Sequence, residues 1–552
     1  MEKRALIAFV LSLAVLVFWE MYFGLVRTPP TNTAQEQTQA TAPAPEPSPS
    51  APPLKSLLPE ALPKDRPTTT GQTFDRWLVD TSLYEMQVAS PGARIDAFQL
   101  NQYRQTVDAD SPAMDMVRTK TSGYLPMAVD LLNHSDWELS TRPFASDAPK
   151  TVNINPDDPS TQLSFFTTVP EKVKLTKSFN VTPGTYVVDA TIAIENLSAD
   201  QLSDQLGVSF YFQPYEAGET SYNISQISLL KNGALEYFQT KDILKKTPVF
   251  EPPVDWIGYE NNYFIQALVP LEKEGYKVVP RVLDENKHLL QLVYLTDPFE
   301  LAKGETKTFK IRLYMGPKEI ETLQQAGHDL TRAVDFGWFT FLAKPLLLVL
   351  RWFYKYTHNY GVAIILLTVI IKIIFWPLTH KSYKSMQVMK KIQPKIAQVR
   401  EKYKDDREKL NQELMMLYRT YKVNPLGGCL PMVLQIPVFF ALYRMLYGAL
   451  ELRHKPFMLW INDLTAPDRL HIGIDIPYLG GIPVLTLLMG VSMFIQQKMT
   501  PTGGDPRQEQ IMLLMPVIFT VFFINFPSGL VLYWLVNNIL SIVQQYWINR
   551  QA

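Results

Sequence analysis

One charged residue stands inside the most apolar stretch of this 552-residue chain. Residues 361–379 read GVAIILLTVIIKIIFWPLT, which is long enough to cross a bilayer as a helix, and the cation among them is Lys372. A cation at that depth costs about 2.5–3.5 kcal/mol on insertion scales, so it must face water, a partner or the interior of a helix bundle. Alternatively, its long side chain lets the ammonium reach the cytoplasmic headgroups, roughly 10 Å away. Lys372 is therefore a candidate for a functional site.

Other polar side chains lie in four of the later apolar segments, and they are Thr368, Gln435, Thr520, Asn537 and Asn538. A hydrogen bond between side chains in a membrane contributes only about 0.6 kcal/mol on average, which is too little to offset the charge on Lys372. No carboxylate lies in the central part of any of the last five apolar segments. We therefore expect a polar cavity between helices, with an unpaired cation that suits an acidic or polar guest.

The sequence lacks the motifs that several kinds of chemistry require. The chain has no phosphate-binding Gly-x-x-x-x-Gly-Lys-Ser/Thr loop, and its apolar segments carry no HExxH motif and no Ser/His/Asp set. The missing intramembrane carboxylates also argue against a proton-coupled pump. A single cysteine, Cys429, excludes an internal disulfide framework. We expect no enzyme activity, no cofactor and no metal, and the zero net charge gives no reason to expect sequence-specific binding of nucleic acid.

The apolar segments predict a polytopic α-helical membrane protein with six transmembrane helices and both termini in the cytoplasm. The basic start and long apolar run of residues 1–27 favour an uncleaved anchor over a signal peptide, and a Pro-rich linker follows at 28–70. The later predicted segments are an interfacial amphipathic helix at 336–358, transmembrane helices at 359–379, 425–450, 479–497, 511–526 and 529–548, a cytoplasmic helical hairpin at 380–424, a periplasmic loop at 451–478 and a cytoplasmic loop at 498–510.

Two of these helical predictions have alternatives or details that bear on the topology. Aromatic residues bracket the segment 336–358, and we expect Pro345 to interrupt it. If this segment were a true span, the orientation of everything after it would be reversed. The region 380–424 holds about twelve basic residues against about five acidic ones, so the positive-inside rule assigns it to the cytoplasm. Its function is either to dock a ribosome or anionic lipid, or simply to be a solvated loop.

Residues 71–335 have the period-two alternation and the β-branched and aromatic enrichment of strands. The expected strands are Trp77–Val79, Glu85–Val88, Leu163–Thr168, Lys172–Asn180, Tyr186–Asn196, Val208–Phe212, His288–Leu295 and Thr306–Tyr314. They predict a large antiparallel β-sandwich on the periplasmic side of the membrane. Glu216, Glu219 and Tyr222 are the residues that we would expect to line a sugar pocket if this region were an enzyme.

Two long runs carry a resemblance to a known family. The sequences KVNPLGGCLPMVLQIPVFFALYRML (422–446) and MPVIFTVFFINFPSGLVLYWLVNNILSIVQQ (515–545), together with the order of the spans, resemble the YidC family of membrane protein insertases of Gram-negative bacteria. The resemblance is sharpest over residues 361–548. It implies an inner-membrane protein in which a five-helix core encloses a hydrophilic groove, open to the cytoplasm and lipid.

The resemblance also implies partners and site residues. The partners are nascent membrane proteins, the Sec translocon with its accessory subunits, the ribosome through the cytoplasmic hairpin, and the lipid bilayer. Lys372 stands where the family usually has arginine, so it keeps the charge but loses the planar fork that grips a carboxylate. The other residues that match the groove or its greasy slide are Gln435, Phe439, Phe519, Tyr533, Trp534 and Asn537. Thr368, in the same apolar segment as Lys372, is expected to line the groove with them.

Two other functions are compatible with the sequence. A small-solute transporter would use the same polar cavity, but its folds are built from internal repeats, and the sequence has no visible repeat. An enzyme would have its active site in the β region. Deleting the β region would abolish the activity of an enzyme but would spare the activity of an insertase core.

Overall fold

The computed structural model describes residues 62, 63, 67, 74–215, 223–421, 423, 430–473, 476, 479–500 and 506–550. The predicted anchor at 1–27, nearly all of the linker at 28–70, Cys429 and the three residues of the supposed sugar pocket therefore lie outside the described residues. The chain divides into two compact units. The β unit runs to Gln105 and from Ala113 to Ala333, and the helical unit comprises Thr106–Pro112 and the chain from Val334 onward.

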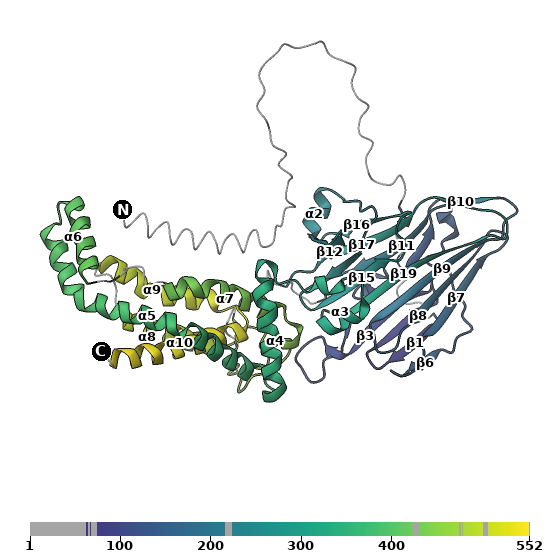
Figure 1. Cartoon of the computed structure of the whole chain (residues 1–552). Helices are drawn as coiled ribbons and strands as arrows, with labels where there is room; N and C mark the ends of the chain where they lie inside the picture. The colour runs from purple at the N-terminus through teal and green to yellow at the C-terminus, as the bar shows by residue number, and fades with distance from the viewer. Residues whose placement is uncertain are drawn as a thin grey trace, which may run out of the picture. The chain divides into compact units, whose positions relative to one another are not determined.

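The β unit consists of four sheets (Figure 1). The largest has eight strands in the order β13-β12-β14-β15-β19-β9-β8-β7, and the next has five in the order β4-β3-β2-β1-β6. A four-stranded sheet, β16-β17-β11-β5, and a pair, β10-β18, complete it. The strands are β1 Arg76–Thr81, β2 Tyr84–Ala89, β3 Arg94–Arg104, β4 Ala113–Asp115, β5 Ala128–Leu131, β6 Thr151–Ile154, β7 Thr161–Val169, β8 Val173–Val181, β9 Val187–Asn196, β10 Leu202–Asp204, β11 Leu206–Phe212, β12 Gln226–Lys231, β13 Ala234–Phe238, β14 Trp256–Glu260, β15 Phe264–Pro270, β16 Tyr276–Asp284, β17 Leu289–Thr296, β18 Phe299–Leu301 and β19 Thr306–Pro317.

The β character predicted for this region is confirmed, although its details differ. Every predicted strand overlaps an observed one, because strands such as β8 bury every second residue and so alternate in sequence. The prediction missed the other eleven strands, among them β14 and β15, which are wholly buried and so do not alternate. The described strands pair antiparallel, as expected, with one exception: β1 pairs with β6 in parallel, with Leu78 opposite Thr151.

The helical unit holds seven longer helices and short 3-10 turns within its described residues (Figure 1). The β unit adds two short helices, α2 and α3. The helices are α2 Thr240–Lys245, α3 Ile320–Ala326, α4 Thr340–Thr357, α5 Tyr360–Lys402, α6 Arg407–Thr420, α7 Leu430–Gly448, α8 Val484–Met499, α9 Pro506–Phe523 and α10 Ser528–Arg550.

Helix α5 carries Lys372 and is 43 residues long. The side chain of Asn359 accepts a hydrogen bond from the Val362 amide at 3.1 Å and so caps its start. The helix continues through Pro377 past residue 380, so the predicted span and the first arm of the hairpin form one helix. Among the described residues, α5 alone is long and apolar enough to cross a membrane by length and composition, while α8 and the apolar part of α9, Met512–Phe523, are shorter. The count of six spans stays a prediction.

Helix α4 corrects the expectation for Pro345. The helix runs unbroken from Thr340 to Thr357 with Pro345 inside it. Pro345 lies in the second turn, so the helix loses a single backbone hydrogen bond near its start. One face of α4 is buried through Ala343, Leu347 and Leu350, and large apolar side chains on the other face are exposed, among them Phe341, Leu348, Trp352 and Tyr356.

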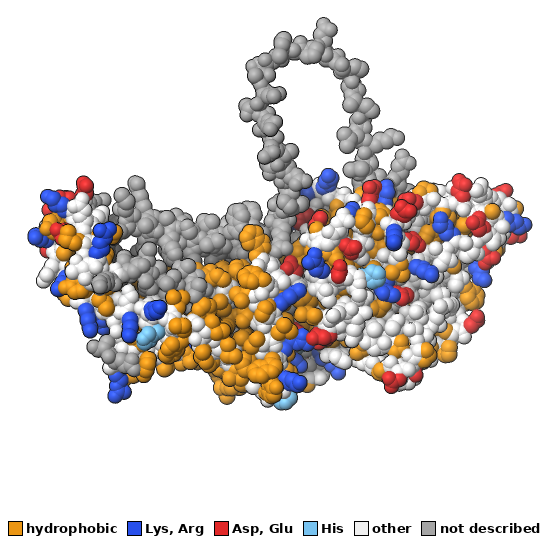
Figure 2. Space-filling model, viewed as in Figure 1, with side chains coloured by type: hydrophobic (Ala, Val, Ile, Leu, Met, Phe, Trp, Pro, Cys, Tyr) orange, Lys and Arg blue, Asp and Glu red, His pale blue; other side chains and the backbone are white. Residues whose placement is uncertain are grey.

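The far part of α5 and α6 form a pair of helices joined by a short turn. Asp406 caps α6 by accepting a hydrogen bond from the Lys409 amide at 3.1 Å. Ile392, Ile396 and Leu414 make the small apolar core between the two helices, and Met389, Val399, Leu410, Leu417 and Tyr418 pack against it. The exposed surface of this pair carries many basic side chains, seen as blue patches at its end of Figure 2.

The outer surfaces of α8, α9 and α10 are apolar. Figure 2 shows hydrophobic side chains gathered over much of the helical unit. Such large exposed apolar patches are rare on soluble monomers and mark contact with a partner or a membrane. The exposed residues include Leu487, Leu488, Val491, Val517, Ile518, Val521, Ile539 and Val543.

Candidate functional site

The ammonium of Lys372 lies between α5 and α10. Its Nζ donates a hydrogen bond to Ser541 Oγ at 2.6 Å. The Ser541 hydroxyl in turn donates to the backbone carbonyl of Asn537, one helical turn earlier, at 2.7 Å. Within the part of the chain that the structure describes, no carboxylate pairs with Lys372. The cation is therefore held by one neutral hydroxyl.

A small cavity adjoins this cation. It is partly open to solvent and draws its lining from α5, α7 and α10. Its polar lining residues are Lys372, Thr379, Gln435 and Asn537, and its apolar ones are Ile371, Phe375 and Leu378. We call this space the polar cavity. A desolvated cation beside mixed polar and apolar walls can attract a carboxylate or a polarised carbonyl.

The site residues predicted from the sequence do not all meet in the polar cavity. Lys372, Gln435 and Asn537 line it. Tyr533 is buried behind it, where its Oη accepts a hydrogen bond from Gln435 Nε2 at 3.3 Å. Thr368 is fully buried, and its hydroxyl donates to the Ile364 carbonyl at 2.7 Å, so it is satisfied within α5 and does not line the cavity.

The other three predicted aromatic residues lie together instead. The ring of Trp534 on α10 meets Phe439 on α7 edge-on, with 4.9 Å between centroids, and stacks on Phe519 of α9 at 6.2 Å. Phe523 of α9 joins them, 5.3 Å from Trp534. We call these four residues the aromatic cluster. It joins α7, α9 and α10, and so brings together helices that α8 separates along the chain.

Ser541 and Thr379 belong to the site, although they were not among its predicted residues. Ser541 bonds the cation, and Thr379 both lines the polar cavity and accepts a hydrogen bond from Gln544 Nε2 at 2.9 Å. The sequence contains a spacing that could have identified Ser541. Asn537, Ser541 and Gln544 follow one another at spacings of four and three, which assigns them to one face of α10.

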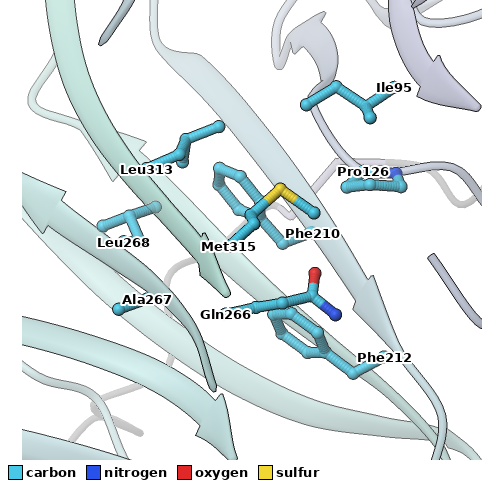
Figure 3. Close-up of a pocket in the computed structure, with 9 residues that line it drawn as sticks. All are labelled: Ile95, Pro126, Phe210, Phe212, Gln266, Ala267, Leu268, Leu313 and Met315. Carbon is cyan, nitrogen blue, oxygen red and sulfur yellow. The ribbon is translucent and has the colours of Figure 1, made fainter. Parts of the chain in front are cut away.

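The β unit has its own cavity, between β11 and the strands β15 and β19. Figure 3 shows the side chains of Phe210, Phe212, Leu313 and Met315 turned toward a common space. Its one polar side chain, Gln266, donates to the Met116 carbonyl at 2.6 Å. The described residues contain no group of three or more His, Cys, Asp or Glu side chains that could hold a metal ion. This cavity offers neither an acid–base pair nor a nucleophile.

A second lysine is buried in the β unit, and its surroundings differ from those of Lys372. Lys177 is 1% exposed, and its Nζ donates to the carbonyls of Gly92 and Met127, each at 2.5 Å, and of Ala93 at 3.4 Å. Burial, together with the neighbouring Arg94, holds the pKa of Lys177 well below its ordinary value, although Asp130 acts in the opposite direction.

Comparisons with known proteins agree over the whole chain. A family model described as 60Kd inner membrane protein matches residues 352–552, and one described as YidC periplasmic domain matches residues 76–349. The membrane protein insertase YidC of Syntrophobacter fumaroxidans is 63% identical over 555 residues, covering 100% of both chains. That of Syntrophus aciditrophicus is 40% identical over 572 residues, again covering 100% of both.

Among solved structures, an active YidC insertase crystal structure with the first transmembrane domain resolved is similar at 19% identity and a TM-score of 0.38. The match covers 87% of this chain and 94% of that one.

Proposed function

The chain belongs to the YidC family of membrane protein insertases, and we propose that it receives the polar segment of a nascent membrane protein in the polar cavity beside Lys372. The observation that carries this proposal is the convergence of Lys372, Gln435 and Asn537, from three helices, on one cavity. The cation is bonded to a neutral hydroxyl, so its charge stays available to a guest.

Electrostatics favours an acidic or polar guest. A unit charge at 4 Å from another interacts by about 4 kcal/mol at an effective dielectric constant near 20. A guest carboxylate that approaches Lys372 would gain part of this energy and would offset the cost of keeping the cation away from bulk water. Lysine offers a point charge where arginine offers a planar fork, so the attraction would depend little on the guest's orientation.

The apolar part of the guest would follow the aromatic cluster. Phe439, Phe519 and Trp534 join α7, α9 and α10 beside the exposed apolar surfaces of α9 and α10. A substrate helix that slides along these side chains would pass into lipid, at about 25 cal/mol per Å² of apolar surface removed from water. The membrane potential would help an acidic segment outward by about 2.3 kcal/mol per charge per 100 mV. No covalent step is required.

The remaining partners and the topology also belong to the proposal. The basic surface of the α5–α6 pair suits a ribosome or anionic lipid on the cytoplasmic side, because positive charge is retained there. In this topology the helices lie in the inner membrane of a bacterium, the β unit is in the periplasm, and both termini are in the cytoplasm. Cooperation with the Sec translocon and its accessory subunits would serve larger substrates, which need more than one cavity of this size.

The test uses purified full-length protein in liposomes with a short single-span substrate that carries an acidic translocated end. Protease protection of that end is scored for wild type, Lys372→Arg, Lys372→Ala and empty liposomes. We expect protection with wild type and Lys372→Arg well above empty liposomes, and a marked loss with Lys372→Ala. Equal protection by wild type and Lys372→Ala would mean that Lys372 serves only as an anchor at the headgroups.

A further inference from the structure

The loop between α7 and α8 is bonded to the starts of two other helices. The side-chain Nδ2 of Asn359 at the start of α5 donates to the Phe457 carbonyl at 2.7 Å. At the start of α10, the Gly529 amide donates to the Leu464 carbonyl at 2.9 Å. Lys372 lies twelve residues after the start of α5, roughly 18 Å away at 1.5 Å per residue. The loop therefore gathers helix ends at a distance from the polar cavity.

Asp468 in this loop caps α8. Its buried carboxylate accepts hydrogen bonds from the amides of Leu485 and Thr486, the second and third residues of the helix. The N-cap position itself is Pro483, which has no side-chain oxygen to do this. The second carboxylate oxygen accepts from Trp460 Nε1 at 2.5 Å. A carboxylate from outside the helix thus meets the positive end of its dipole.

The next residue, Arg469, serves the opposite kind of helix end. Its Nη1 donates to the Ile524 carbonyl and its Nη2 to Asn525 Oδ1, each at 2.8 Å. Both residues directly follow α9, which ends at Phe523. A cation is favourable there because the last carbonyls of a helix are unsatisfied and partly negative. Adjacent charges of opposite sign therefore hold the start of α8 and the end of α9.

The end of α9 lies beside the aromatic cluster, and α8 packs against α9. Helices α8 and α9 approach so closely that a Cβ added to Gly490 would lie 2.1 Å from Thr520 Oγ1, so they are packed as one hairpin. Phe523, the residue before the carbonyl that Arg469 binds, lies 5.3 Å from Trp534 and 6.2 Å from Phe439 between ring centroids. If the Arg469 side chain moved, the end of α9 would move with it. Phe523 of the aromatic cluster is only one residue from the carbonyl that Arg469 binds.

We propose that Asp468 and Arg469 are positioning residues that fix the α8–α9 hairpin, so that the aromatic cluster meets the apolar segment of the substrate in register. The proposal rests on the proposed function, since it concerns the path of the same substrate. Neither side chain needs to touch the substrate.

The first test measures the hairpin itself. Spin labels are attached to cysteines at two exposed positions, Val521 on α9 and Ile539 on α10, in a Cys429→Ser background. We expect the distance distribution between them to broaden or shift in Asp468→Ala and in Arg469→Gln. The control is Lys455→Ala, which removes an exposed charge from the same loop and should leave the distribution unchanged. A distribution that is unchanged in both variants overturns the proposal.

The second test separates positioning from stability. Pro483→Asp, added to Asp468→Ala, supplies a new cap for α8 within the helix but does not reconnect the helix to the loop. We expect this double variant to regain the wild-type melting temperature while its initial rate of insertion stays about threefold to tenfold low, because a displaced binding surface lowers the rate even when the helix itself is stable. Recovery of both quantities would show a merely structural role. If wild type itself inserts nothing, the proposed function fails instead.

Discussion

Lys177 in the β unit and Lys372 in the helical unit are both cations held away from bulk water, but their neighbours differ. Three backbone carbonyls surround Lys177 and use all three of its donors. Lys372 donates to one serine hydroxyl and borders a cavity. A saturated buried cation fixes the segments that bond it, whereas one with unused donors and space beside it can bind a guest. Burial alone therefore does not identify the functional lysine.

The largest effect should come from Lys177→Met. This substitution keeps much of the side-chain volume but leaves three carbonyls without their donor, which costs about 2–4 kcal/mol of unfolding free energy. We expect the β unit of the full chain to melt at a clearly lower temperature by differential scanning calorimetry. Lys174→Met, on the other face of β8, is the control and should change little. A Lys177→Met protein that melts with the wild type would contradict the structural role.

The matched substitution in the helical unit, Lys372→Met, should have the opposite pattern. We expect a change of less than about 1 kcal/mol in unfolding free energy, because a single membrane hydrogen bond is lost and a desolvated charge is removed with it. Insertion of a substrate with an acidic end should fall about tenfold, equivalent to about 1.4 kcal/mol of lost attraction. The measurement is the initial rate of protease protection per folded molecule. Loss of melting temperature without loss of insertion would reverse the comparison.

The pH dependence of the β unit sharpens the comparison. The pKa of Lys177 in the folded chain lies below 10.5, its ordinary value, so the unfolded chain binds more protons between those two pH values. This lysine therefore makes the free energy of unfolding rise with pH in that window, and the contribution is lost as the pH falls through the lowered pKa. Subtracting the profile of Lys177→Met removes the tyrosine titrations that overlap. A flat difference between the two profiles would refute the assignment.

The smallest effect should come from Gln435→Ala. The hydrogen bond from Gln435 to Tyr533 is neutral and long, at 3.3 Å, and such bonds contribute about 0.6 kcal/mol in a membrane. We expect insertion of the acidic-end substrate to fall about threefold. Gln435→Glu provides the stricter comparison, since a carboxylate in the cavity would occupy Lys372 and should reduce insertion further. An unchanged or higher rate in Gln435→Glu would argue that the free charge is not used.

Much of the candidate site could be predicted because a lone cation in an apolar run has few acceptable environments. The prediction that Lys372, Gln435 and Asn537 face a shared space follows from this, and all three line the polar cavity. Thr368 does not, because a threonine in a helix can satisfy its hydroxyl on a carbonyl four residues earlier. The contact to Ser541 depends on how α5 and α10 pack, which periodicity does not fix.

The fold was predictable where a strand or helix has one buried face. The alternating strand β8 and the family resemblance were both recognised from the sequence, and the family is confirmed by the relatives. The parallel pairing of β1 with β6 was not predicted, because it joins segments about 70 residues apart. Pro345 gave a misleading signal of interruption, since a helix held by its neighbours tolerates the loss of one backbone bond.

The most direct test of the central claim exchanges charges between the protein and its substrate. Wild type and Lys372→Glu are reconstituted, and each is given two single-span substrates whose translocated ends differ only in carrying acidic or basic residues. We predict that Lys372→Glu inserts the acidic-end substrate far less well than wild type and the basic-end substrate as well or better. An equal loss for both substrates would contradict the claim that the charge of Lys372 receives the translocated segment.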